Sequence, residues 1–324
     1  MNTRRRWLAA GAAWPALAWT GALRAQAKPP VTIGWLEVTG HEFGQFGLSA
    51  FKEGMAALGW RLGTHYLLEE RYAAGLVERL PALARELAAR KPAVIVTTPS
   101  ISAKAAAAAA PTIPVVVANG DPMSTGTVNS LARPEGMVTG LSNVVHDLNG
   151  KLVELLIETL PRLQRVGFLV DPTNRSSTTD ARRASERLRV EAVVVEMARP
   201  EDIEPAMARL AEAKVQAMVV LPSAWFVAYI PTIMRSALAR RWPVVASFAG
   251  YARQGGLFSY GPDRTVLFRR SAHYVDRILK GARPGDLPIE QAMTFELVLN
   301  LKTARLLGIA MPPSMMIRAT EVIE

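Results

Sequence analysis

Short apolar runs rich in β-branched residues alternate along the chain with stretches in which apolar residues recur at helical spacing. The run Val31–Leu36 precedes a predicted helix over about residues 43–58, and the run Ala93–Thr97 precedes a small-residue helix over about 102–110. Strands that are apolar throughout, each followed by an amphipathic helix, are typical of parallel sheets covered on both faces. The pattern therefore predicts an α/β fold.

The same layout occurs twice. The predicted strands are 31–36, 66–70, 93–97 and 114–118 in the first half, and 166–170, 192–196, 217–221 and 244–246 in the second. Two such blocks predict two Rossmann-like, doubly wound lobes. Further strand–helix units follow near the end of the chain, and chain crossovers between the lobes would form a hinge.

This layout implies a division of the chain between the lobes. We expect residues 28–142, together with about 250–290, to form the N-terminal lobe. Residues 143–249, together with about 291–324, are expected to form the C-terminal lobe.

Residues 1–27 have the order of a secretory signal. A basic start at Arg4, Arg5 and Arg6 is followed by an uncharged apolar stretch and by the small-x-small site Ala25-Gln26-Ala27. The start also resembles a twin-arginine export signal, and the general secretory route stays open. A membrane anchor is disfavoured because the apolar run is short for a span, which needs about 20 residues, and contains Pro15. We expect cleavage after Ala27.

Composition adds limits to this picture. The chain has 324 residues, 50% of them apolar and 20% charged, with a formal net charge of +10. Such a chain can bury an ample core and is not typical of a disordered protein. It has no cysteine, which excludes disulfides, thiolate metal sites and cysteine-linked lipid anchors. The four histidines are scattered, so no histidine metal centre and no cofactor is expected.

Charge and motifs narrow the function classes. Basic residues are dispersed, and no basic stripe interleaves with aromatic residues, so we expect no nucleic-acid partner. The sequence has no phosphate-binding G-x-x-x-x-G-K-[ST] loop, no G-x-G-x-x-G after the first strand and no G-x-S-x-G nucleophile elbow. Glu37 with Glu42 and Glu69 with Glu70 are the available carboxylate pairs, and surface charge or strand ends explain them. The sequence favours a binding protein over an enzyme.

In open α/β sheets, ligands bind beyond the carboxyl ends of the strands, so the residues that follow each strand are the candidates. The run from Thr98 to Ser102 places hydroxyls and free N–H groups at a helix start, which suits a carboxylate, although the same residues also serve as ordinary caps. Aromatic residues in the second half can form apolar walls or pack in the core. The predicted ligand-binding residues are Thr39, Thr98, Ser100, Ser102, Asn119, Asp121, Asp171, Asn174, Ser223, Trp225, Phe248 and Tyr251.

A series of motifs keeps a fixed order over nearly the whole chain after residue 27. They are Arg79-Leu80-Pro81-Ala82-Leu83-Ala84, Asp121-Pro122-x-x-x-Gly126-x-Val128-x-Ser130-Leu131-x-Arg133-Pro134-x-Gly136-x-x-Thr139-Gly140, Ser259-Tyr260-Gly261-Pro262, Arg277-Ile278-Leu279-Lys280-Gly281, and the stretch from Phe295 to Ala304. Together they resemble the ABC-transporter substrate-binding proteins that include tryptophan- and tyrosine-binding members.

The resemblance implies a type I periplasmic binding protein, which has two Rossmann-like lobes, three crossovers and a ligand between the lobes. Ser223 stands where many relatives carry an acidic residue that can hold an ammonium group. The ligand therefore stays open between an amino acid, a small carboxylate and another small molecule.

These observations lead to one main hypothesis and two alternatives. We expect a periplasmic, monomeric solute-binding protein that hands a small molecule to an ABC permease of the inner membrane. An exported enzyme on the same scaffold is the first alternative, and it predicts a strongly perturbed acid or base between the lobes. A ligand-binding sensor partner of a membrane kinase is the second.

Overall fold

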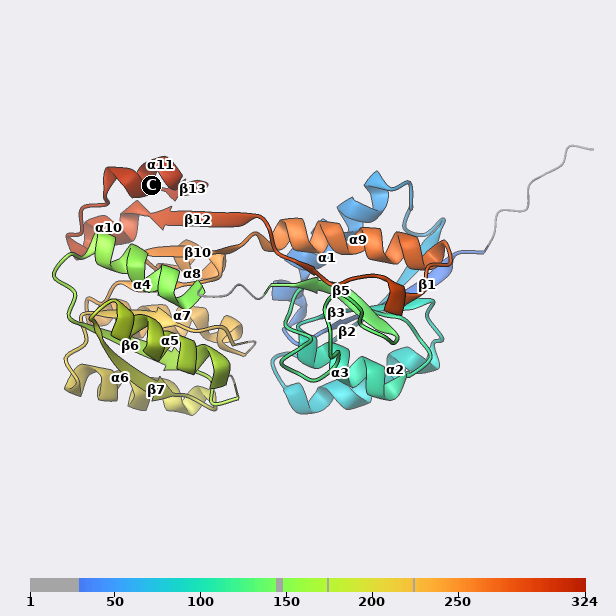
Figure 1. Cartoon of the computed structure of the whole chain (residues 1–324), viewed down its shortest axis with the longest axis horizontal. Coiled ribbons are helices and arrows are strands. Elements are labelled where there is room, and N and C mark those ends of the chain that lie inside the picture. Colours follow the sequence, from blue (N-terminus) through green and yellow to red (C-terminus); the bar gives the residue numbers. More distant parts are fainter. Residues whose placement is uncertain (1–28, 144–147, 174, 224) are drawn as a thin grey trace, which may run out of the picture.

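The computed structural model describes residues 29–143, 148–173, 175–223 and 225–324. They form two lobes that lie side by side, each built around one β-sheet (Figure 1). The expected signal peptide at residues 1–27 lies outside these ranges. Within them, no helix is both long enough and apolar enough to cross a membrane.

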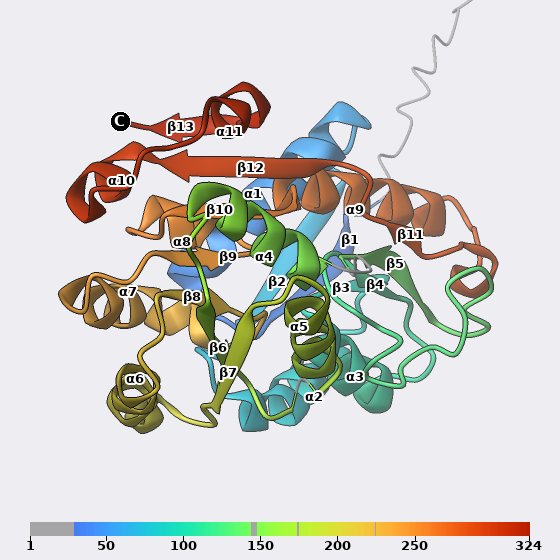
Figure 2. The same ribbon diagram turned by 60° about the vertical axis from the view of Figure 1, so that its left-hand side comes forward.

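The first lobe contains a six-stranded parallel sheet with the order β11-β5-β4-β3-β1-β2. Its strands are β1 (Val31–Glu37), β2 (Tyr66–Tyr72), β3 (Val94–Thr98), β4 (Val115–Val117), β5 (Val138–Ser142) and β11 (Glu290–Gln291). Its helices are α1 (His41–Ala57), α2 (Leu80–Ala89), α3 (Ser100–Ala109) and α9 (Arg264–Leu279). Figures 1 and 2 both place α9 beside α1.

Successive residues of β1 and β3 face opposite sides, so each face of this sheet has its own core. Ile33 and Trp35 belong to the cluster that contains Phe51 of α1 and Phe268 of α9. On the other face, Leu36 belongs to the cluster formed with α2 and α3. Helices thus cover both faces, as the continuously apolar strands predict.

The second lobe contains a seven-stranded sheet with the order β13-β12-β10-β9-β8-β6-β7. Its strands are β6 (Arg165–Val170), β7 (Glu191–Glu196), β8 (Ala217–Val220), β9 (Val244–Ala246), β10 (Phe258–Pro262), β12 (Phe295–Asn300) and β13 (Glu321–Ile323). Its helices are α4 (Leu148–Thr159), α5 (Arg175–Arg187), α6 (Ile203–Glu212), α7 (Ile230–Ala239), α8 (Ala249–Arg253), α10 (Leu301–Leu307) and α11 (Pro313–Arg318). Only the pairing of β10 with β12 is antiparallel among the described strands of this sheet.

The two lobes repeat one topology. Strands β1 to β5 and strands β6 to β10 have the same relative order, in which the second strand is followed across the sheet by the first, third, fourth and fifth. This is the flavodoxin-like doubly wound order. The prediction of two copies of one α/β layout is confirmed.

The chain passes between the lobes three times. It runs from β5 to α4, from β10 through Asp263 to α9, and from β11 to β12. The predicted division placed residues from about 250 in the first lobe, which is wrong for α8 and β10. Strand β10 pairs with β9 and β12 in the second sheet, because the chain crosses only after Pro262.

Some elements differ from the predicted pattern. Strand β5 and helix α4 were not predicted, since β5 contains Gly140 and α4 has Asn149 and Gly150 in its first turn. A short 3-10 helix, Phe226–Tyr229, leads directly into α7, which has Pro231 in its first turn.

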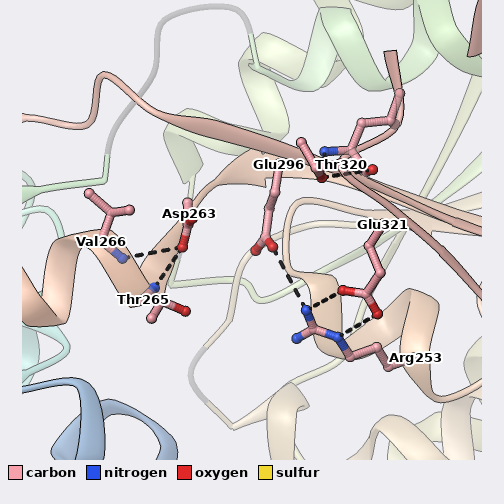
Figure 3. A network of polar contacts seen from close by, with 8 residues as sticks. Arg253, Asp263, Thr265, Val266, Glu296, Thr320 and Glu321 are labelled. Atoms are coloured by element: carbon pink, nitrogen blue, oxygen red, sulfur yellow. Dashed lines mark hydrogen bonds and ion pairs between the residues drawn. The ribbon is translucent and has the colours of Figure 1, made fainter. Parts of the chain in front are cut away.

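Polar contacts fix the last strand to the second lobe. Arg253 of α8 donates from Nε and Nη2 to the two carboxylate oxygens of Glu321 in β13, at 3.2 and 2.6 Å (Figure 3). Its Nη2 also lies 3.9 Å from Glu296 of β12. Thr320 bonds the backbone of Leu297 through both its N–H and its hydroxyl. These contacts hold β12 and β13 together at the edge of the sheet.

Candidate functional site

Each sheet has a switch point where the strand order reverses, between β1 and β3 in the first lobe and between β6 and β8 in the second. Ligands of open α/β sheets bind at such points, beyond the carboxyl ends of the strands. The carboxyl ends of β5 and β10 lead directly into the other lobe. Parallel strands end at the same edge, so the carboxyl edges of both sheets face the opposite lobe (Figure 1).

Three polar side chains lie at the ends of adjacent strands in the first lobe. Glu37 of β1 is paired in register with Thr98 of β3 on one side and with Tyr72 of β2 on the other. The backbone N–H of Thr39 donates to Glu37 Oε1 at 3.1 Å. The Tyr72 hydroxyl donates to Glu70 Oε2 at 2.7 Å and accepts from Gln45 Nε2 at 3.3 Å. This row of groups crosses the first switch point.

Glu37 is a buried carboxyl, with 4% of its surface exposed. Burial raises the pKa of Glu37 to about 7, while the Thr39 N–H and the Arg264 guanidinium act in the opposite direction. The sequence places this residue at a strand end, as the structure confirms, but surface charge was the wrong explanation for it. A strongly apolar strand that ends in a carboxylate was the available signal.

The start of α3 holds an unusual hydroxyl. Ser100 Oγ is buried and has no hydrogen-bond partner within the part of the chain that the structure describes. Gly120 lies directly against it, because a Cβ on Gly120 would collide with Ser100 Oγ and lie 2.6 Å from its N atom. Ser102, in contrast, donates its hydroxyl to the Thr98 carbonyl at 3.1 Å. Ser100 is the free polar group of this helix start.

Two further predicted ligand-binding residues, Asn119 and Asp121, make hydrogen bonds to nearby parts of the first lobe. Asn143 begins the crossover, and its Nδ2 donates to Asn119 Oδ1 at 2.9 Å while its N–H donates to the Gly120 carbonyl at 2.9 Å. Asp121 accepts from the N–H of Ser124 at 3.1 Å. Asn119 therefore holds Asn143, the last described residue before the first crossover, and Asp121 stabilises a separate turn.

Two polar side chains are hydrogen-bonded to each other at the switch point of the second lobe. Ser223, which follows β8, donates to Asp171 Oδ2, which follows β6, at 2.7 Å. The other oxygen of Asp171 accepts from the N–H and the hydroxyl of Thr173 at 2.9 and 2.6 Å. The two predicted residues Asp171 and Ser223 thus lie together, whereas Asn174 falls outside the described residues.

The predicted aromatic walls have different surroundings. Trp225 is half-buried and packs edge to face against Phe226 and Tyr229, with ring centroids 4.4 and 5.7 Å apart. Tyr251 is buried in the core of the second lobe, and its hydroxyl has no partner among the described atoms. Phe248 is half-buried and lies edge to face on Tyr251, at 6.4 Å between ring centroids. Phe248 and Trp225 are thus partly exposed, whereas Tyr251 is enclosed in the core.

A residue that the sequence did not single out adjoins these groups. The guanidinium carbon of Arg264, at the start of α9, lies 4.5 Å from the centre of the Phe248 ring. Its charge also attracts Glu37, although burial lowers the pKa of the guanidinium. Among the described residues, no group of three or more His, Asp or Glu side chains is placed to hold a metal ion.

Comparison with known proteins identifies the family. The model of the ABC transporter substrate binding protein family matches residues 41–323. The tyrosine-binding protein of Clostridioides difficile strain R20291 is 22% identical over 288 residues, covering 88% of this chain and 83% of that protein.

Two solved structures are also similar. A conserved domain protein of Vibrio cholerae O1 biovar El Tor has a TM-score of 0.85 and 26% identity, covering 91% of this chain and all of that one. An ABC domain from Streptococcus pneumoniae in complex with L-Trp has a TM-score of 0.85 and 23% identity, with the same coverage. The predicted architecture, that of a type I periplasmic binding protein, is confirmed. The chain belongs to the family of ABC transporter substrate-binding proteins.

Proposed function

We propose that this chain is an exported, monomeric solute-binding protein that captures a small molecule between its lobes and delivers it to an ABC permease of the inner membrane. The observation that carries the proposal is the pair of switch points whose carboxyl edges face opposite lobes, each lined with polar groups. The signal-like residues 1–27 support a location in the periplasm.

The chemistry of the two edges favours a free amino acid as the ligand. The Ser100 hydroxyl, at the N-terminus of α3, suits a carboxylate. Asp171 of the second lobe suits an ammonium group, with Ser223 holding one of its oxygens. Phe248 and Trp225 offer apolar surface for a side chain. Because relatives are a tyrosine-binding protein and a domain solved with L-Trp, L-tyrosine and L-tryptophan are the first compounds to test.

A thermal-shift screen of amino acids and small carboxylates tests this function. A true ligand at a hundredfold excess over its Kd should stabilise the protein by about 2.7 kcal/mol, because it binds only the folded state. No shift with any amino acid or carboxylate would argue against the proposed solute-binding role.

Ser100→Ala should weaken the binding of an identified ligand about tenfold, since it removes one hydrogen bond to a charged group. Ser102→Ala in the same helix is the matched control, because its hydroxyl already bonds Thr98, and its affinity should stay within about twofold of the wild type. Isothermal titration calorimetry measures both. Equal affinities for wild type and Ser100→Ala would move the carboxylate site away from α3.

The enzyme alternative rests on one observation, the raised pKa of buried Glu37. Incubation of an identified ligand with the protein, followed by mass spectrometry, separates the two functions. A binding protein returns the compound unchanged, whereas an enzyme converts it in proportion to time and protein concentration.

A further inference from the structure

Arg264 lies where the chain crosses between the lobes for the second time. Strand β10 ends at Pro262 in the second sheet, and α9 begins two residues later and packs on α1 in the first lobe. Asp263 caps α9 by accepting from the N–H groups of Thr265 and Val266 at 2.9 and 3.2 Å (Figure 3). The position of Arg264 is therefore tied to the first lobe by a capped helix.

The guanidinium of Arg264 contacts an aromatic ring from each lobe. Its carbon lies 4.5 Å from the centre of Phe248 and 5.6 Å from the centre of Phe268. Phe268 is one turn further along α9 and belongs to the buried core of the first lobe. Phe248 connects β9 to α8 in the second lobe and packs on Tyr251. The cation thus joins the two lobes at a crossover.

One nitrogen of the Arg264 guanidinium is unpaired among the described residues. Its Nε atom is buried and has no hydrogen-bond partner in the described part of the chain. Two carboxyl groups attract it, Glu37 from β1 of the first lobe and Glu296 from β12 of the second. A partly buried cation gains more from a ring face than an exposed one does, so the contact with Phe248 stabilises the Arg264 side chain.

We propose that Arg264 is a positioning residue for ligand capture, because its contact with Phe248 favours the relative placement of the lobes seen here over more open placements. Rotation of the second lobe about the crossovers moves Phe248, whereas Arg264 stays with α9. Only the expected effect on ligand affinity rests on the proposed function. A ligand that binds the present placement of the lobes binds more weakly when that placement is less populated.

The absence of cysteine allows a direct measurement without added ligand. Spin labels on Lys104→Cys in α3 and Glu212→Cys in α6, both exposed, report the distance between the lobes by pulsed electron paramagnetic resonance. Arg264→Gln should lower the ratio of the present placement to more open ones by roughly three- to thirtyfold. Phe248→Leu, which keeps an apolar side chain, should have a similar effect, and the double variant should add little.

Arg269→Gln is the matched control. Arg269 lies on the same helix but pairs with Glu53 of α1 within the first lobe, at 2.7 Å, so its replacement should leave the distance distribution unchanged. Wild-type distances in both Arg264→Gln and Phe248→Leu would overturn the proposal. If Arg264→Gln does not fold, as judged by circular dichroism, Phe248→Leu alone decides.

A second measurement tests the affinity of the protein for L-tryptophan. If L-tryptophan stabilises the wild type, Arg264→Gln should bind it more weakly by about the factor by which the fraction of the protein in the present placement falls. If neither L-tryptophan nor any other compound of the screen binds, the proposed function fails, whereas the ligand-free distances still support or overturn the role of Arg264.

Discussion

Glu37→Gln should raise the free energy of unfolding by about 3 kcal/mol at pH 8 and by far less at pH 4.5. The native carboxyl has a pKa of about 7, against an ordinary value of 4.5. Between these values the folded state binds more protons than the unfolded chain, so Glu37 lowers stability as the pH rises through this window. Glutamine cannot ionise, yet its amide oxygen can still accept from the Thr39 N–H.

Urea unfolding of both proteins from pH 4.5 to 8 measures this difference. Groups common to both proteins cancel, so the difference should grow with pH and level off above about 7. Glu42→Gln, at an exposed position shortly after β1, is the control and should change stability by at most about 0.5 kcal/mol. A gain for Glu37→Gln that is the same at every pH would contradict the assigned cause.

Gly54→Ala should destabilise the protein by about 2 kcal/mol, although alanine is the better helix former. A Cβ at Gly54 would collide with the carbonyl oxygen of Arg269 and lie 2.9 Å from the Cβ of Ala272. These atoms belong to α9, so the helices must separate. Overpacking of this kind costs more than the roughly 1 kcal/mol that alanine gains over glycine in a helix.

A substitution of alanine by glycine in the same helix separates helix propensity from packing. Ala56 lies in the last turn of the same helix and is exposed, so Ala56→Gly should cost at most about 1 kcal/mol through helix propensity alone. Chemical unfolding measures both variants. A free energy of unfolding for Gly54→Ala equal to or above that of the wild type would show that α1 and α9 tolerate a wider spacing.

The repeated architecture was predictable because its signal is local. Apolar strands followed by amphipathic helices identify doubly covered parallel sheets wherever they occur. Strand β5 was not predicted because Gly140 interrupts an apolar run of only five residues. Glycine is required at this position, since a Cβ would collide with the Val117 carbonyl of β4. The lobe to which β10 belongs depends on its pairing with β9 and β12, which no local pattern contains.

The part of the candidate site that follows from local sequence was also predictable. Strand ends could be located, so Ser100, Asp171 and Ser223 were predicted as candidates together with residues such as Asp121 that stabilise turns. The burial of Glu37 depends on the pairing of β1 with β2 and β3, and the contact of Arg264 with Phe248 depends on how the lobes lie together. Local spacing cannot show such contacts between distant segments.

The three crossovers also determine when each lobe can be completed during synthesis. Helix α9 and strand β11 finish the first sheet and its covering layer only after most of the second lobe has been made. A nascent chain that ends before residue 264 leaves the face of α1 around Gly47, Leu48 and Phe51 without the helix that buries it. Such surfaces favour aggregation of unfinished chains. The first lobe is complete once β11 is made and the second only once β13 is made, so both lobes depend on the last third of the protein.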